Sequence, residues 1–200
     1  MGHLEPGFVN FDSSFTEEEY VRQCLTGASG YTNMAFYRSV NGKALIVKKI
    51  GSFKAPAKIN TCLHVLGKRS DGYHELAMLM QPISLYDEIE IICTDGSFVQ
   101  VNCPGVEMPA GTENITALAA KVLLREAGVD CSVVINLKKN IPVAAGLGGG
   151  SSDAATVLLG LNEMLNLGFS REKLMEIGVS LGADVPFFIF GNSALATGIG

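Results

Sequence analysis

The chain has 200 residues, of which 48% are hydrophobic, and a net charge of −5. This is enough to bury the core of one compact domain of roughly 150 residues and to leave an appendage. With 15 basic against 20 acidic residues, a nucleic-acid partner is excluded because no basic patch could neutralise its phosphates. No apolar run has membrane-spanning length, so no membrane partner is expected. Five scattered cysteines without metal-binding spacing predict reduced thiols in a cytoplasmic protein.

Residues 1–53 differ from the rest of the chain. Their apolar residues show no sustained period, and several glycines interrupt them. A short helix over residues 16–25 fits a capping box formed by Thr16 and Glu19. We interpret residues 1–53 as an amino-terminal appendage and expect the functional domain at residues 54–200.

From Lys54 onward the pattern becomes regular. The predicted elements are, in chain order, strands at 58–65, 74–83 and 86–92, a helix at 112–127, a strand at 132–137, helices at 152–165 and 170–182, and a strand at 187–190. A Ser-Asp-Gly turn predicts that the first two strands form a hairpin. Strands that precede a mixture of strands and helices indicate an α+β sandwich. Residues 196–200 predict a flexible turn, and we expect the chain to be truncated after this turn.

The first of these strands has two unlike faces. Alternation places Ile59, Leu63 and Val65 on one apolar face, and Lys58 and Asn60 on the opposite polar face. A single lysine is usually a solvated charge. A lysine inside a strand that shares a face with an amide more often has a specific purpose.

The most informative segment is residues 141–155, where four glycines precede two serines and a helix-forming run. Backbone without a β-carbon can approach a ligand closely, and the N–H groups at a helix N-terminus bind anions. A tight turn alone needs one or two glycines, so the segment is interpreted as a loop that binds polyphosphate. The Walker pattern is excluded because no lysine follows the last glycine. The dinucleotide fingerprint is excluded because Ser151 occupies the place of its third glycine.

This loop resembles the second motif of the GHMP small-molecule kinases, a family named for galactokinase and for homoserine, mevalonate and phosphomevalonate kinases. Three further segments resemble those members that phosphorylate a cytidine diphosphate-linked methylerythritol: APAKIN at 55–60, KRSDGYHEL at 68–76 and GADVP at 182–186. The resemblance covers residues 54–200. It implies a two-layer α/β sandwich of the GHMP kinase amino-terminal type, which is like domain 2 of ribosomal protein S5. The family normally has a second domain, and we expect that domain to be missing here.

The resemblance also implies an activity. It implies an ATP-dependent kinase that phosphorylates the 2-hydroxyl of this small molecule, on the non-mevalonate route to isoprenoid precursors. Asp184 is then the catalytic base, although by itself it would be a solvated turn aspartate. Lys58 polarises the hydroxyl and offsets the negative charge of phosphoryl transfer. Asn60 contacts the substrate near its reacting carbons, and Tyr73 and His74 form the cytidine pocket.

ATP and Mg²⁺ are the implied cofactors. The residues expected to bind ATP are Asn114 and Lys139 at the adenine and Pro142, Gly146, Leu147, Gly148, Gly149, Gly150, Ser151 and Ser152 at the phosphates. Ser152, or Ser151 beside it, is the candidate magnesium ligand, because magnesium prefers oxygen ligands. Asp153 is either an acid in the first helical turn or an outer partner of the metal. A branched side chain at Gly148 is expected to occupy phosphate space.

Two alternatives stay open. The first is another GHMP kinase, and the DGYHEL segment distinguishes it, because sugar and amino-alcohol kinases have no cytosine to recognise. The second is a non-catalytic nucleotide-binding fragment of such a kinase, which would bind ATP without turnover. The sequence predicts no oligomeric state.

Overall fold

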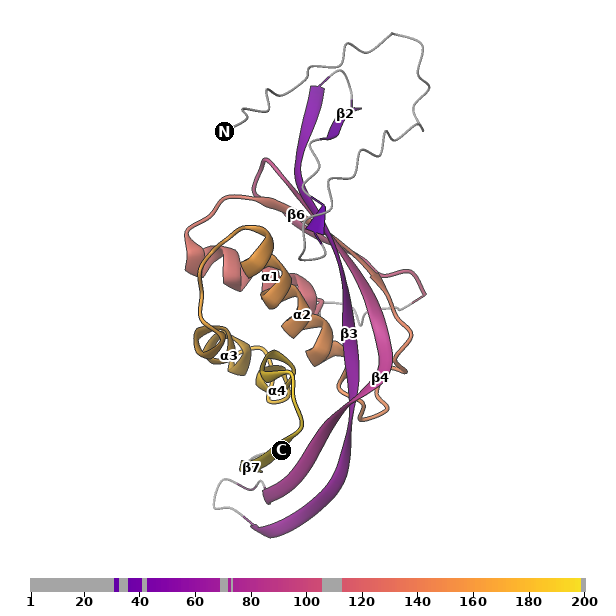
Figure 1. The fold of residues 1–200 in the computed structure, drawn as a ribbon, viewed down its shortest axis with the longest axis vertical. Coiled ribbons are helices and arrows are strands. Elements are labelled where there is room, and N and C mark those ends of the chain that lie inside the picture. The colour runs from indigo at the N-terminus through magenta and orange to yellow at the C-terminus, as the bar shows by residue number, and fades with distance from the viewer. Residues whose placement is uncertain are drawn as a thin grey trace, which may run out of the picture.

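The computed structural model describes residues 31–32, 36–40, 43–68, 72, 74–105 and 113–198, with side chains from residue 49 onward. Tyr73 and the helix expected at residues 16–25 lie outside this set. In the described part, four helices cover one face of a mixed sheet (Figure 1), and the other face of the sheet carries none. The predicted two-layer α+β architecture is therefore confirmed. No helix in the described part combines the length and the apolar character needed to cross a membrane.

The sheet is mostly antiparallel. Its strands are β1 (Tyr31–Thr32), β2 (Phe36–Val40), β3 (Lys43–Lys68), β4 (His74–Thr94), β5 (Val99–Asn102), β6 (Ser132–Lys138) and β7 (Ala194–Gly198). The helices are α1 (Ile115–Ala127), α2 (Gly149–Met164), α3 (Arg171–Val179) and α4 (Val185–Phe190). The strand order is β1-β3-β4-β6-β5, with β2 paired to β3 and β7 paired to β4. Only the β5–β6 pair is parallel among these strands.

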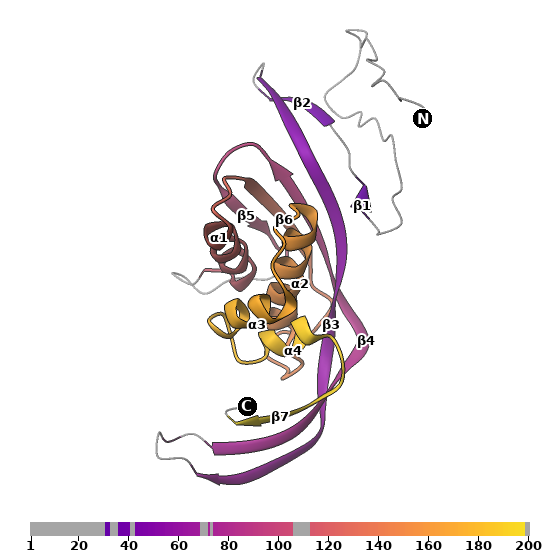
Figure 2. The same ribbon diagram turned by 60° about the vertical axis from the view of Figure 1, so that its left-hand side comes forward.

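Strands β3 and β4 form one long antiparallel ribbon whose lower end curls toward the side of the sheet that carries the helices (Figure 1 and Figure 2). Lys68 pairs with His74, which confirms the predicted hairpin. The strands expected at 74–83 and 86–92 are a single strand, β4, whose two parts are joined by a bulge at residues 84–85. Strand β3 crosses the boundary expected at residue 54 without a break.

A further bulge corrects the predicted faces of β3. Thr61 is an extra residue there, because the register with β4 shifts by one residue at that point. An extra residue reverses the side on which the following side chains lie. Leu63 and Val65 therefore share the face of Lys58, and do not lie with Ile59 as predicted.

Two predictions near the carboxyl end of the described residues were wrong. Residues 187–190 form helix α4 rather than a strand, and residues 196–198 belong to strand β7 rather than to a flexible turn. A short apolar run is compatible with a buried strand or a buried helix, and here packing selects the helix. Strand β7 is ordered by its antiparallel pairing with residues 76–80 of β4.

The start of α3 and the end of α1 agree with the predicted ranges, whereas α3 ends at Val179, before the predicted residue 182. The Ser170 side chain accepts a hydrogen bond from the N–H of Lys173 at the start of α3. Helix α1 ends at Gly128, which has the left-handed φ of 60° typical of a C-terminal glycine. Helix α2 begins at Gly149, three residues before the predicted start, because its first turn is built from the glycines of the loop.

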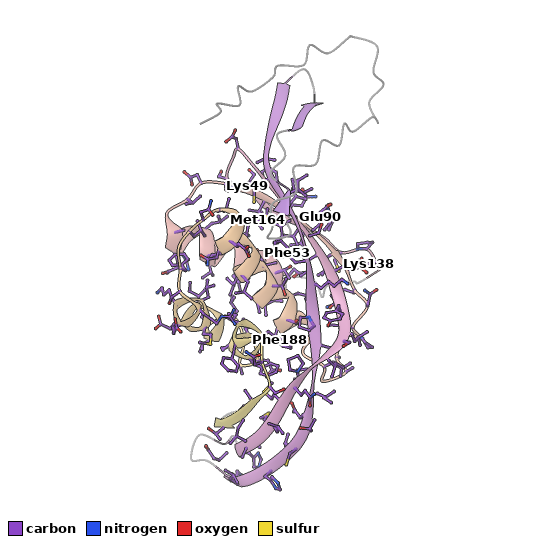
Figure 3. All side chains as sticks on the ribbon, in the orientation of Figure 1. Lys49, Phe53, Glu90, Lys138, Met164 and Phe188 are labelled. Carbon is purple, nitrogen blue, oxygen red and sulfur yellow. The ribbon has the colours of Figure 1, made fainter. Side chains whose placement is uncertain are left out.

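Helix α2 packs closely on β3 at the sheet centre. A β-carbon on Gly160 would lie 2.9 Å from the Phe53 ring, so the helix can approach the strand only where that side chain is absent. Lys49 donates a hydrogen bond to the carbonyl of Met164 at the negative end of the helix dipole. Figure 3 shows these three labelled residues, Lys49, Phe53 and Met164, close together where β3 passes α2. This contact fixes α2, and therefore the loop at its other end, relative to the sheet.

Candidate functional site

Residues 139–148, here called the glycine loop, join β6 to α2. The loop is attached to β3, because the Lys58 N–H donates to the Leu147 carbonyl at 3.0 Å. Gly148 is the N-cap of α2 and no side chain caps the helix there. The first intrahelical bond of the α2 N-terminus is donated by Ser152 to the Gly148 carbonyl. The N–H groups of residues 149–151 therefore have no intrahelical partner and stand at the positive end of the dipole.

Gly148 lies against protein atoms. Its φ is +71°, and an added β-carbon would lie 2.8 Å from the Phe188 ring and 3.2 Å from the Lys58 side chain. Gly146 has nearly the same φ, +73°, but nothing within 4 Å of the same position. A side chain at Gly148 would therefore displace Phe188 and Lys58, which corrects the expectation that it would enter the phosphate space.

Lys58, Asn60 and Asp184 come together beside this loop. The Lys58 ammonium lies 3.0 Å from Asn60 Oδ1 and 3.7 Å from Asp184 Oδ2. The Lys58 side chain is 7% exposed and that of Asp184 is 27% exposed. Asp184 is the N-cap residue of α4, yet it makes no capping hydrogen bond. Its carboxylate is directed to Lys58 instead, so the interpretation as a solvated turn aspartate does not describe it.

The two serines of the loop have different surroundings. A β-carbon on Gly182 would lie 3.7 Å from Ser151 Oγ, so the half-buried Ser151 adjoins the turn that carries Asp184. Ser152 is fully buried, and its hydroxyl has no hydrogen-bond partner. The described residues contain no group of three or more His, Cys, Asp or Glu that could hold a metal ion.

Lys139 and Asp153 belong to a buried cluster behind the loop. The Lys139 ammonium donates to Asp153 Oδ2 at 2.6 Å and also to the buried Asp87 of β4. Burial raises the pKa of Asp153 to about 7, although the Lys139 ammonium opposes the shift. Asp153 lies beyond the first turn of α2, which corrects the interpretation as a first-turn acid. Its side chain is 2% exposed and pairs with Lys139. Asp87 is not among the predicted site residues, and its only signal in the sequence is an acid on the same strand face as Ile89 and Ile91.

Of the other predicted site residues, Asn114 lies near the start of α2, whereas His74 lies far from Lys58 and Asp184. Asn114 caps α1 by accepting hydrogen bonds from the N–H and hydroxyl of Thr116 at 2.9 and 2.6 Å. A β-carbon on Gly150 would lie 3.7 Å from the Ile115 side chain, so this end of α1 adjoins the first turn of α2. His74 is exposed at the start of β4. It lies six residues from the partner of Asn60, roughly 20 Å along the strand.

Comparisons with known proteins match this arrangement. Residues 114–192, which include α1, β6, the glycine loop and α2 to α4, match the family described as "GHMP kinases N terminal domain". A crystal structure of 4-(cytidine 5'-diphospho)-2C-methyl-D-erythritol kinase superimposes with a TM-score of 0.65 at 43% identity, over 74% of this chain and 52% of that one. Residues 114–192 therefore match the GHMP kinase N-terminal domain, and the chain has the fold of that domain.

The chain is also similar to curated proteins that share one name. It is 62% identical over 149 residues to the 4-diphosphocytidyl-2-C-methyl-D-erythritol kinase of Syntrophotalea carbinolica, and 60% identical over 149 residues to that of Geobacter metallireducens. Each alignment covers 74% of this chain and 53% of the relative. The chain thus spans about half the length of the curated relatives it matches.

Proposed function

We propose that this chain is the ATP-binding part of a kinase that phosphorylates the 2-hydroxyl of 4-diphosphocytidyl-2-C-methyl-D-erythritol. One observation carries the proposal: Lys58, Asp184 and the uncapped start of α2 meet at a single place. The relatives' shared name supplies the substrate, and the DGYHEL segment agrees with a cytidine-linked one. A small-molecule substrate and a cytoplasmic location are parts of the same proposal.

The start of α2 suits a polyphosphate. The N–H groups of residues 149–151 have no intrahelical partner, the helix dipole is positive there, and Lys58 adds a full positive charge. When ATP is bound, it supplies the phosphoryl group that is transferred. Gly146 leaves open space on the loop, where the chain can approach a phosphate closely. Of the two serines, we assign Ser151 as the magnesium ligand, because the Ser152 hydroxyl is fully buried.

The protein groups then have distinct tasks. Asp184 Oδ2 accepts the proton of the attacking hydroxyl, and the Lys58 ammonium stabilises the negative charge that develops beside it. Asn60 holds that ammonium from the other side through the 3.0 Å hydrogen bond. Because phosphoryl transfer needs little covalent chemistry from the protein, this positioning supplies most of the rate gain. Tyr73 and His74 are assigned to the cytidine, and His74 stands at the start of β4.

A turnover assay tests the proposal. The purified chain is incubated with ATP, Mg²⁺ and the cytidylyl substrate, and the phosphorylated product is measured by mass spectrometry. Mevalonate and homoserine serve as competing acceptors, and Asp184→Asn is the inactive control. We expect product from the cytidylyl substrate alone. Phosphorylation of mevalonate or homoserine instead would overturn the substrate assignment and favour another member of the family.

A second candidate is nucleotide binding without turnover, which the uncapped start of α2 beside Lys58 suits by itself. Calorimetry with a non-hydrolysable ATP analogue separates the candidates. Binding of the analogue together with turnover supports the kinase, whereas binding without turnover supports the second candidate. Absence of binding would refute both.

A further inference from the structure

The buried carboxylate of Asp87 holds the beginning of the glycine loop. Its Oδ1 accepts hydrogen bonds from the N–H groups of Asn140 and Ile141 at 2.6 and 2.8 Å, and its Oδ2 accepts from Lys139. One side chain of β4 therefore binds three consecutive residues that follow β6. Hydrogen bonds to an ionised acceptor are stronger than neutral ones, so this stem of the loop is firmly held to the sheet.

The same cluster reaches the other stem of the loop. The Lys139 ammonium also donates to Asp153 Oδ2, on the second turn of α2, at 2.6 Å. A β-carbon on Gly149, the first residue of α2, would lie 3.1 Å from the Lys139 nitrogen. The ammonium thus packs directly behind the helix start and joins it to β4 through Asp87.

The cluster is buried and contains two acids for one base. The carboxyl groups of Asp87 and Asp153, 0% and 2% exposed, face a single ammonium, and Asp153 Oδ1 has no hydrogen-bond partner. Burying charged groups is costly, and a buried ion pair is often no more stabilising than apolar side chains of the same size. Stability is therefore a poor reason for this arrangement. Its geometry, which connects both stems of one loop, is a better one.

We propose that Asp87, Lys139 and Asp153 are positioning residues, which hold the two stems of the glycine loop at the spacing that phosphate binding requires and do not touch the nucleotide. The inference rests on the proposed function, because it concerns how the same loop binds ATP. Lys139 has three N–H donors, and two of them are used by the carboxylates. It therefore acts on the nucleotide through the loop rather than at the adenine.

The test separates the phosphate part of ATP from its base. Calorimetry on the full chain measures binding of three probes: a non-hydrolysable ATP analogue, inorganic tripolyphosphate and adenosine. The variants are Lys139→Met and Asp153→Asn. The matched control is Lys138→Met, which makes the same change at the preceding residue, where an exposed lysine pairs with Glu88 on the outer face of the sheet. Figure 3 shows Lys138 on that face, away from the helices.

We expect both variants to weaken binding of the ATP analogue and of tripolyphosphate by on the order of tenfold or more. Lys139→Met loses the hydrogen bonds to both carboxyl groups, and Asp153→Asn loses the negative charge that faces the Lys139 ammonium. Adenosine binding should not change, and Lys138→Met should bind all three probes like the unmodified chain. Loss of adenosine binding with tripolyphosphate binding intact would place Lys139 at the base and overturn the proposal. Unchanged binding in both variants would overturn it as well.

Two further measurements keep the test decisive. Thermal unfolding without ligand shows whether a variant is folded. If Lys139→Met does not fold, Asp153→Asn still provides the test, because it retains the Asp87–Lys139 ion pair, whose net charge is zero. Hydrogen exchange should become faster at the amides of Asn140 and Ile141 in both variants, which binding data alone would not reveal. If the unmodified chain binds neither the ATP analogue nor tripolyphosphate, the proposed function fails, and this inference fails with it.

Discussion

Replacing Gly148 with alanine tests whether the glycine loop is shaped by its packing on Phe188 and Lys58. The β-carbon would lie 2.8 and 2.9 Å from two atoms of the Phe188 ring and 3.2 Å from the Lys58 side chain. The position also has a φ of +71°, in which L-residues are strained. Gly146→Ala is a matched control, because φ is +73° there and nothing lies within 4 Å of the new carbon.

The expected magnitudes follow from these two causes. The left-handed conformation costs about 1–2 kcal/mol for an alanine, and this cost applies to both variants. Forcing a methyl group into a packed contact adds about 1–3 kcal/mol, and this cost applies only at Gly148. We therefore expect Gly148→Ala to lower the free energy of unfolding by about 2–5 kcal/mol and Gly146→Ala by about 1–2 kcal/mol. The first value is a large part of a typical domain's stability.

Urea denaturation of the two variants measures the difference directly. Calorimetry with an ATP analogue then reports whether displacement of Phe188 and Lys58 also disturbs the loop, and we expect weaker binding for Gly148→Ala. Equal losses of unfolding free energy in the two variants would refute the reasoning, because only Gly148 has the packing contact. Larger losses at Gly146 would refute it as well.

Further predictions concern other parts of the domain. Asp184→Asn should reduce turnover by at least 100-fold in a steady-state assay and leave binding of an ATP analogue nearly unchanged; a variant that keeps most of its rate removes Asp184 from the role of base. Because burial raises the pKa of Asp153 to about 7, the folded state holds its proton more tightly than the unfolded chain. The free energy of unfolding should therefore fall by a few kcal/mol as the pH rises from about 4 to about 7, and a pH series of urea titrations on Asp153→Asn should show no such fall. Gly160→Ala should destabilise the fold by about 1–3 kcal/mol, since its β-carbon would meet Phe53 at 2.9 Å and Ile91 at 3.2 Å; an unchanged melting temperature would contradict this contact.

Local signals predicted most elements correctly because their causes lie within a few residues. The Ser170 cap and the Gly128 terminus are examples, since each depends on backbone groups of the same helix. Longer-range effects caused the errors. Thr61 reverses the faces of β3 through a register that only β4 defines, and residues 187–190 are helical because of the core around them.

The candidate site divides in the same way. Glycines in a row before a helix indicate an anion-binding loop from the sequence alone, because backbone freedom and the helix dipole are local properties. Lys58 and Asp184 were identified by resemblance, and their 3.7 Å separation depends on how β3 meets the start of α4.

By itself, therefore, the sequence determined which chemical groups are available: a glycine-rich loop with accessible backbone N–H groups, a lysine inside a strand, and helices with defined first and last residues. Only the tertiary structure decided which groups meet. Asp87 is 52 residues from Lys139 in the chain and yet holds the loop stem, and Phe188 lies where a side chain on Gly148 would be. Such contacts join distant segments, and their partners are selected by the packing of the whole sheet against its helices, which no short pattern of residues encodes.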